Sequence, residues 1–136
     1  VTALEDTATM EEAANLLRET GYTRVPVYHE DMDHIVGILN EKDFYACQHE
    51  GVDSIVDIMK PPVYAPATLK LSKLLKLFQT QKTHMLIVLD EFGGTEGIVT
   101  MEDVLEELVG EIYDEDDNEG KSAAAPQKPQ KKEAGK

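Results

Sequence analysis

The sequence predicts an α/β (α+β) fold made of two tandem β-α-β-β-α repeats that pack sheet against sheet about a pseudo-twofold axis. The first observation behind this prediction is an internal similarity that aligns 23–43 with 83–103 without a gap. Four positions are identical in this alignment: Thr23/Thr83, Gly37/Gly97, Ile38/Ile98 and Asp43/Asp103. The second observation is that each block follows apolar residues at helical spacing and contains two short apolar runs typical of strands. Each repeat is too small to fold stably on its own, so the two are expected to share a core.

Repeat 1 is expected to open with a lead-in strand over 2–4 and then a helix. The apolar face of this helix consists of Met10, Ala13, Ala14 and Leu17. Thr9 is its expected N-cap, and Gly21 is expected to end it, because glycine readily adopts the left-handed conformation at a helix C-terminus. The helices of the two repeats match best with a one-residue slip, which Gly21 would absorb. The later elements are expected in this order: strand 24–28, turn 29–34, strand 35–39, helix 41–49 and a short helix near 52–59.

Repeat 2 begins after Lys60-Pro61-Pro62, a helix-breaking sequence that marks the boundary between the repeats. Its elements are expected in this order: lead-in strand 63–65, a helix with Leu71, Leu74, Leu75 and Phe78 on one face, strand 84–89, turn 90–94, strand 96–100 and helix 101–110. Thr68 or Ser72 is expected to be a cap or a first-turn residue of the first helix, and the apolar run Met85–Leu89 should be buried on both faces. The last helix should turn four apolar residues inward: Val104, Leu105, Leu108 and Val109.

The predicted domains are therefore repeat 1 over 1–60, repeat 2 over 61–112, and an acidic linker with a Lys-rich tail over 113–136. Lys and Arg number 13 and Asp and Glu number 27, which gives a net charge of −14. Because so negative a surface repels phosphate backbones, nonspecific nucleic-acid binding is excluded. Residues 1–120 carry 8 basic and 26 acidic residues, whereas 121–136 carry five Lys and one Glu. The tail has no side chain that could enter a core, so it is expected to be disordered.

Several classes of function find no support in the sequence. Cys47 is the only cysteine, which excludes an internal disulfide and a cysteine-based zinc site and favours a reducing compartment. The four histidines lack metal-ligand spacing, and no Ser/His/Asp or Cys/His pairing indicates catalysis, so the chain is not expected to be an enzyme. The acidic run 102–117 could attract Mg²⁺ through water, but such runs are more often a solvated helix face. No metal site is therefore expected in the protein alone. The apolar runs are far shorter than the ~20 residues that cross a bilayer, so the chain itself is expected to be soluble.

The most specific candidate for a ligand-binding site lies at the start of the last predicted helix. Gly97 allows close backbone approach, Thr100 ends the strand, and Asp103 lies in the first helical turn. Free N–H groups and the helix dipole attract phosphate there, the threonine hydroxyl can donate to it, and a carboxylate is suited to bridging two ribose hydroxyls. The alternative, from these residues alone, is an ordinary N-cap with an acidic first turn and no ligand.

Longer stretches of both repeats resemble a known family. The pattern G-h-h-T-x-x-D, present as G-I-V-T-M-E-D at 97–103, resembles tandem cystathionine-β-synthase (CBS) domains, also called a Bateman module, over roughly 1–112. Three segments are similar to the cytosolic CBS pair of the hemolysin-C-like, cobalt/magnesium-efflux (CorC-type) membrane proteins: Y-T-R-V-P-V-Y at 22–28, D-H-I-V-G-I-L-N-E-K-D-F at 33–44 and H-M-L-I-V-L-D-E-F-G-G-T-E-G-I-V-T-M-E-D-V-L-E-E-L-V-G-E-I at 84–112. Such proteins have an N-terminal transmembrane domain and often a C-terminal transporter-associated domain, so the resemblance implies that this chain is a fragment of a longer membrane protein.

The resemblance also implies an adenine-nucleotide site in repeat 2. Its implied residues are Thr100, Asp103, His84, Met85 and Ile87 from repeat 2 and Thr23, Arg24 and Pro26 from repeat 1. Thr100 and Asp103 would bind the nucleotide, and the strand from His84 to Ile87 would line the adenine pocket. Thr23 belongs by the repeat to an equivalent site in repeat 1, but it could reach the Thr100 cleft because the clefts lie between the paired sheets. Pro26 within a strand indicates an irregular or edge position that exposes backbone to a ligand, or a simple edge strand.

A weaker second cleft is predicted from Asn40, Lys42 and Asp43, together with Thr83. Asn40 stands where repeat 2 has Thr100, so the hydroxyl for phosphate is lost although the capping ability is kept. Arg24 and Lys42 could supply cations to a polyphosphate, or they could form surface ion pairs in an acidic protein.

The resemblance implies a regulatory module, and the residues give no support for an enzyme. It would bind ATP or AMP, with Mg²⁺ screening the phosphates against the acidic surface, and control the transmembrane domain of a divalent-cation (Mg/Co) transporter or hemolysin-like protein. The resemblance further implies a homodimer at the cytoplasmic face of the cell membrane. The alternative is a dimerisation or partner-docking module whose clefts are empty, and Asn40 favours at most one good site.

Overall fold

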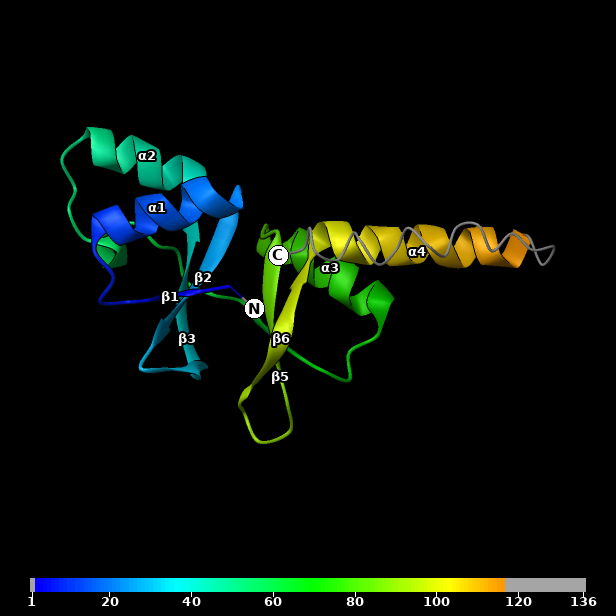
Figure 1. Ribbon diagram of the computed structural model, residues 1–136. Coiled ribbons are helices and arrows are strands. Elements are labelled where there is room, and N and C mark those ends of the chain that lie inside the picture. Colours follow the sequence, from blue (N-terminus) through cyan, green and yellow to red (C-terminus); the bar gives the residue numbers. More distant parts are fainter. Residues whose placement is uncertain (1, 117–136) are drawn as a thin grey trace.

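The computed structural model describes residues 2–116, and within them it confirms two β-α-β-β-α repeats (Figure 1). Repeat 1 consists of β1 (Leu4–Glu5), α1 (Met10–Thr20), β2 (Arg24–His29), β3 (Asp31–Asn40) and α2 (Glu41–His49). Repeat 2 consists of β4 (Tyr64–Pro66), α3 (Leu71–Gln81), β5 (Met85–Leu89), β6 (Thr95–Thr100) and α4 (Met101–Asp116). The predicted disorder of the tail falls outside the described residues.

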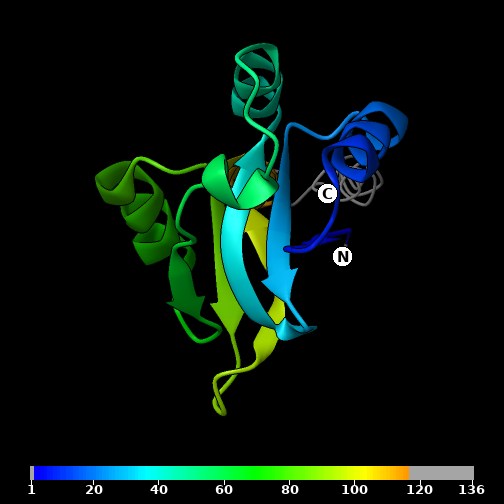
Figure 2. The same cartoon turned by 90° about the vertical axis from the view of Figure 1, so that its left-hand side faces the viewer.

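Each repeat forms a three-stranded sheet, in the orders β1-β2-β3 and β4-β5-β6. In both sheets the lead-in strand pairs in parallel with the central strand, and the central strand forms an antiparallel hairpin with the third. Figures 1 and 2 show the strands in the middle of the molecule with the helices around them. Both hairpin turns lie at the same end of the molecule, and α2 and α4 begin toward the opposite end.

The core has three parts, because every sheet buries one face against helices and the other against the second sheet. Val25, Val27 and Leu39 pack with Leu17 and Phe44 in the helical core of repeat 1. The helical core of repeat 2 is formed by Ala65, Phe78, Leu86 and Val104. Between the sheets lies a cluster of Ile35, Ile38, Met85 and Ile87, with Tyr28, Met32, Leu89 and Ile98 packed against it. This middle cluster confirms the predicted packing of sheet against sheet.

Local sequence explains the ends of α1. Thr9 is the N-cap: its hydroxyl accepts from the Glu12 amide at 3.0 Å while the Glu12 carboxylate accepts from the Thr9 amide at 2.9 Å. Gly21 ends the helix with φ of 72°, as predicted. For α3 the prediction holds in part: Ser72 lies in its first turn, but the N-cap is Lys70, with no side-chain hydrogen bond, and not Thr68.

The strand register corrects the predicted alignment of the repeats. Arg24 pairs with Asn40, whereas Met85 pairs with Thr100. With Asn40 matched to Thr100 as predicted, Arg24 therefore corresponds to Met85 and not to His84. The predicted helical slip thus continues through the central strand, and Thr23 is the structural counterpart of His84 and not of Thr83. This one-residue difference is absorbed in the hairpin of repeat 1, where the pairing of β2 with β3 has register shifts on both sides of Tyr28.

Three element predictions also differ from the structure. The strand expected at 35–39 begins at Asp31, because Glu30 turns the chain with φ of 66° and leaves a tight hairpin. The helix expected near 52–59 is a 3-10 turn over Ile55–Asp57. The helix expected to end at 110 continues to Asp116.

The inward face predicted for α4 was half wrong. Val104 is fully buried and Leu108 packs against the core, but Leu105 and Val109 are 43% and 49% exposed. A single sheet and one neighbouring helix cover only a narrow stripe of α4, so the adjacent apolar positions remain outside. Within residues 2–116 no helix has both the length and the apolar character needed to cross a membrane.

Candidate functional site

The first turn of α4 is organised by two side chains that cap each other. The Thr100 hydroxyl accepts from the Asp103 amide at 3.2 Å, and the Asp103 carboxylate accepts from the Thr100 amide at 3.4 Å through Oδ2. This reciprocal arrangement is a capping box with aspartate in the place of the usual glutamate. It fixes both side chains at the helix N-terminus, where a ligand would also meet the helix dipole.

The capping box leaves one donor and one acceptor available for a ligand. The Thr100 oxygen accepts within the box, so its proton can still be donated to a phosphate oxygen. Asp103 uses Oδ2 in the box, and Oδ1 can still accept from a ribose hydroxyl. The cap predicted as an alternative and the ligand-binding role are therefore compatible in this geometry.

Alternate side chains of β5, the strand beside Thr100, face the other sheet. Met85 pairs with Thr100, and Ile87 pairs with Ile98, so all four side chains share one face of the sheet. Met85 and Ile87 are buried in the cluster between the sheets. The carbonyl of His84 accepts from the Met101 amide at 3.0 Å, which ties the start of β5 to the start of α4.

Repeat 1 presents a matching surface from across the sheet interface. Pro26 pairs with Ile38, which belongs to the cluster between the sheets, so Pro26 and Arg24 two residues earlier lie on the face toward repeat 2. Figures 1 and 2 place the start of β2 toward the same end of the molecule as the start of α4. Pro26 is not on an edge strand, because β2 is central; it lies one residue outside the β1 ladder, which pairs with Val27 and Tyr28.

The equivalent turn of repeat 1 is built differently. The Asn40 carboxamide accepts from the Lys42 amide at 2.9 Å, two residues on, and no reciprocal bond to Asp43 is formed among the described hydrogen bonds. The Asp43 carboxylate instead meets the Lys60 ammonium, with Oδ2 and Nζ 3.5 Å apart. The positions that correspond to Thr100 and Asp103 therefore lack a hydroxyl and carry a neutralised carboxylate.

Two predicted threonines have less direct roles. Thr83 donates its hydroxyl to the Met85 carbonyl at 3.1 Å, so it shapes the turn into β5. The Thr23 carbonyl accepts from the Glu41 amide at 2.8 Å, which matches the link between His84 and Met101. The exposed side chains of Thr23 and His84 lie at these strand starts, and the His84 imidazole is 3.9 Å from the Glu102 carboxylate.

Lys60 was missed by the sequence reasoning. Its backbone forms an antiparallel bridge with Ile38, with bonds of 2.8 and 2.9 Å, which brings the linker between the repeats beside β3 and the lysine to Asp43. Met59 lies over Gly37, where a Cβ would be 2.4 Å from its sulfur. The sequence analysis noted Gly37 only as a position identical to Gly97, and that identity carries no sign of this linker.

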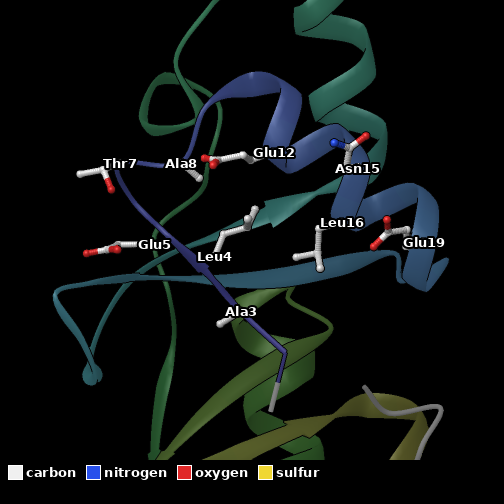
Figure 3. Close-up of a pocket in the computed structure, with 9 residues that line it drawn as sticks. All are labelled: Ala3, Leu4, Glu5, Thr7, Ala8, Glu12, Asn15, Leu16 and Glu19. Carbon is white, nitrogen blue, oxygen red and sulfur yellow. The ribbon is translucent and has the colours of Figure 1, made fainter.

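A pocket of about 510 Å³ lies elsewhere, between β1 and α1 (Figure 3). Its lining includes Leu4, Glu5, Ala8, Glu12, Leu16 and Glu19. None of the predicted site residues contributes to it, and its lining comes from repeat 1 alone. Among the described residues no three His, Cys, Asp or Glu side chains are grouped so that they could hold a metal ion.

Comparison with known families and proteins gives consistent results. The CBS-domain family model matches residues 1–50 and 55–110. The magnesium and cobalt efflux protein CorC of Escherichia coli K12 is 41% identical over 118 residues, which cover 85% of this chain and 40% of CorC. The UPF0053 protein YugS of Bacillus subtilis is 41% identical over 111 residues, which cover 81% of this chain and 26% of YugS. The chain thus spans less than half the length of these relatives.

Solved structures agree with the fold. The CBS domain of a bacterial CNNM/CorC-family Mg²⁺ transporter, solved in complex with ATP, has a TM-score of 0.74 and 46% identity, covering 81% of this chain and 80% of that one. A hemolysin-like CBS protein of Oenococcus oeni has a TM-score of 0.72 and 33% identity, covering 79% of this chain and 81% of that one. CorC is a magnesium and cobalt efflux protein, and the CBS domain solved with ATP belongs to a Mg²⁺ transporter; neither is an enzyme, in line with the predicted class.

Proposed function

This chain belongs to the CBS-domain family, as a tandem pair related to the CorC/CNNM Mg²⁺ transporters and hemolysin-like proteins, and on that premise we propose that it is a regulatory module that binds an adenine nucleotide. The binding cleft lies between the sheets and is headed by Thr100 and Asp103. Met85 and Ile87 line its adenine side, with Arg24 and Pro26 opposite. The observation that carries this proposal is the capping box, which holds an unused hydroxyl proton and an unused carboxylate oxygen at the N-terminus of α4.

The cleft of repeat 1 is the weaker one in this proposal. Asn40 cannot donate a hydroxyl proton to phosphate, and Asp43 is already paired with Lys60. Lys42 and Arg24 still supply positive charge near it. One nucleotide per chain is therefore the expected stoichiometry.

Mg²⁺ enters with the nucleotide and not through a protein site. Glu102, Glu106 and Glu107 follow Thr100 on α4, and the helix has no basic residue over 101–116. Bare triphosphate would be repelled by these carboxylates, so a cation on its phosphates lowers the cost of binding. This places the module's ligand in the class of Mg²⁺-bound adenine nucleotides.

The regulatory part of the proposal concerns the longer protein. The module would act at the cytoplasmic face of the membrane and bias an attached transmembrane domain that moves Mg²⁺ or Co²⁺, through a population shift on nucleotide binding. A homodimer of the module is supported by exposed apolar side chains on its C-terminal helices, Tyr45 on α2 and Leu105 and Val109 on α4. Tyr45 and Leu105 are each the fifth residue of their helix and so occupy corresponding positions of the two repeats.

Titration calorimetry tests the ligand class. We expect ATP with Mg²⁺ to saturate one site per chain, and we expect chelation of Mg²⁺ to weaken ATP at least about tenfold, or about 1.4 kcal/mol. AMP, with less phosphate charge, should lose less than about twofold. ADP and S-adenosylmethionine are titrated as well, so that the contribution of the phosphates to affinity can be compared with that of the adenosine portion. The absence of heat with every nucleotide at millimolar concentration would leave the docking-module alternative in its place.

A further inference from the structure

The tips of the two hairpins, residues 29–34 and 90–96, lie at the end of the molecule opposite the starts of α2 and α4 (Figures 1 and 2). Asp33 connects them, because its Oδ1 accepts from the Thr95 amide at 2.9 Å. The contact is close enough that a Cβ on Gly94 would lie 2.9 Å from the same oxygen. These two hairpin tips, called the hairpin end below, therefore form one surface made from both repeats.

The turn between β5 and β6 is held in a single shape. Asp90 Oδ1 accepts from the amides of Phe92 and Gly94, both at 2.9 Å. The Asp90 amide donates to the Gly94 carbonyl at 2.9 Å, and Gly93, with φ of 85°, donates to the Asp90 carbonyl at 3.1 Å. These four hydrogen bonds fix the backbone that carries Phe92.

The Phe92 side chain is not buried in this fold. Its side chain is 89% exposed, whereas the other exposed large hydrophobic side chains in the described part are between 37% and 49% exposed. A fixed backbone means that little entropy is lost when the ring is buried by a partner, which is the property of an anchor residue in a protein interface. Isolated exposed apolar residues are common on surfaces, but here rigidity and full exposure coincide.

The surroundings of Phe92 are acidic. Neither 29–34 nor 90–96 contains Lys or Arg. The carboxylates in these segments are Glu30, Asp31, Asp33, Asp90, Glu91 and Glu96. His29 and His34 are the only nearby side chains that can become cationic in these segments, and each already contacts a carboxylate, of Asp6 and Asp31 respectively.

We propose that the hairpin end is a docking surface for a basic protein segment. The Phe92 ring inserts between apolar side chains of that segment, and the carboxylates around Phe92 pair with its Lys or Arg residues. Charge complementarity selects this occupant, and Arg can also stack on the ring. An anionic membrane surface is disfavoured because the same carboxylates repel it. This inference is independent of nucleotide binding, since the surface shares no residue with the proposed cleft.

The test uses a fluorescent reporter at the anchor position. The chain has no Trp, so Phe92→Trp in the full 136-residue chain introduces a single one. The probe is a synthetic peptide of alternating Arg and Leu, with an alternating Glu and Leu peptide and phosphatidylglycerol vesicles as the other arms. We expect a saturable blue shift with the basic peptide, weakened at least about tenfold between roughly 50 and 500 mM salt. Tyr45→Trp on α2 is the matched reporter at another exposed aromatic position and should not shift.

A second pair of variants separates a local acidic surface from the overall negative charge. Glu30→Gln with Glu91→Gln, in the Phe92→Trp chain, should weaken the basic peptide at least about fivefold. Glu50→Gln with Asp53→Asn removes the same charge from exposed positions after α2 and should change affinity less than about twofold. Equal weakening by the two pairs would overturn the proposal, as would the same shift at Tyr45→Trp, no shift at Phe92→Trp, or a shift with the vesicles.

Discussion

Asp103→Ala is expected to remove most of the thermal stabilisation that ATP with Mg²⁺ gives the chain. At a nucleotide concentration of about 100 times Kd, binding stabilises the folded state by about 2.7 kcal/mol. Loss of one hydrogen bond to a charged group costs about 1.5–3 kcal/mol, which would leave a stabilisation of roughly 0.3–1.3 kcal/mol at the same concentration. Differential scanning fluorimetry with and without nucleotide measures the difference.

The comparison is made on the ligand-induced shift, because Asp103 also caps α4 and its loss lowers the melting temperature of the free chain. Asp43→Ala is the matched control: it removes the same group from the corresponding position of repeat 1, where the carboxylate faces Lys60. It should retain most of the shift. A larger loss for Asp43→Ala than for Asp103→Ala would mean that the two clefts are ranked in the wrong order.

Phe78→Ala is expected to cause the largest loss of stability, about 3–5 kcal/mol. The Phe78 ring is fully buried on α3 and packs with Leu86 and Val104 in the helical core of repeat 2. Its truncation leaves a cavity that a short sheet and two helices cannot refill. Urea unfolding followed by circular dichroism measures the change.

Phe92→Ala is the matched control for this prediction, since it deletes the same ring from a fully exposed position. It should change the free energy of unfolding by less than about 0.5 kcal/mol. A loss below about 1 kcal/mol for Phe78→Ala would show that the core of repeat 2 is not packed as described.

The two helical cores place their aromatic ring on opposite helices. Repeat 1 has Leu17 on α1 and Phe44 on α2, whereas repeat 2 has Phe78 on α3 and Val104 on α4. Large and small side chains have exchanged places, so each core keeps one ring while identity at these positions is lost. This explains why the repeat shows so few identical residues although the elements match.

Much of the fold was predictable because it depends on local patterns. Helical spacing of apolar residues, the Thr9 cap and the Gly21 stop are properties of a few neighbouring residues, and all three appear in the structure. Register was not predictable in this way. The identity of Thr23 with Thr83 suggested an ungapped match of the central strands, but hairpin geometry displaces that match by one position. Exposure of Leu105 and Val109 depends on what covers α4, which no local pattern contains.

In the candidate site, too, the local features were predictable and the contacts between distant segments were not. Thr100 and Asp103 lie three residues apart, so their mutual cap follows from sequence spacing alone. Placement of Arg24 and Pro26 on the face toward repeat 2 needed the sheet pairing. Lys60 reaches Asp43 only because the linker pairs with Ile38, a contact between segments distant in the sequence that leaves no local signal.

Backbone amide NMR of the chain during titration with ATP and Mg²⁺ tests the central claim most directly, because it reports where the nucleotide binds. We expect the largest saturable shifts at Thr100 and Asp103, with smaller changes at Asn40 and Asp43. Saturable binding that leaves Thr100 and Asp103 unmoved, with the largest shifts instead along the β1–α1 pocket or at the hairpin turns, would contradict the proposed cleft.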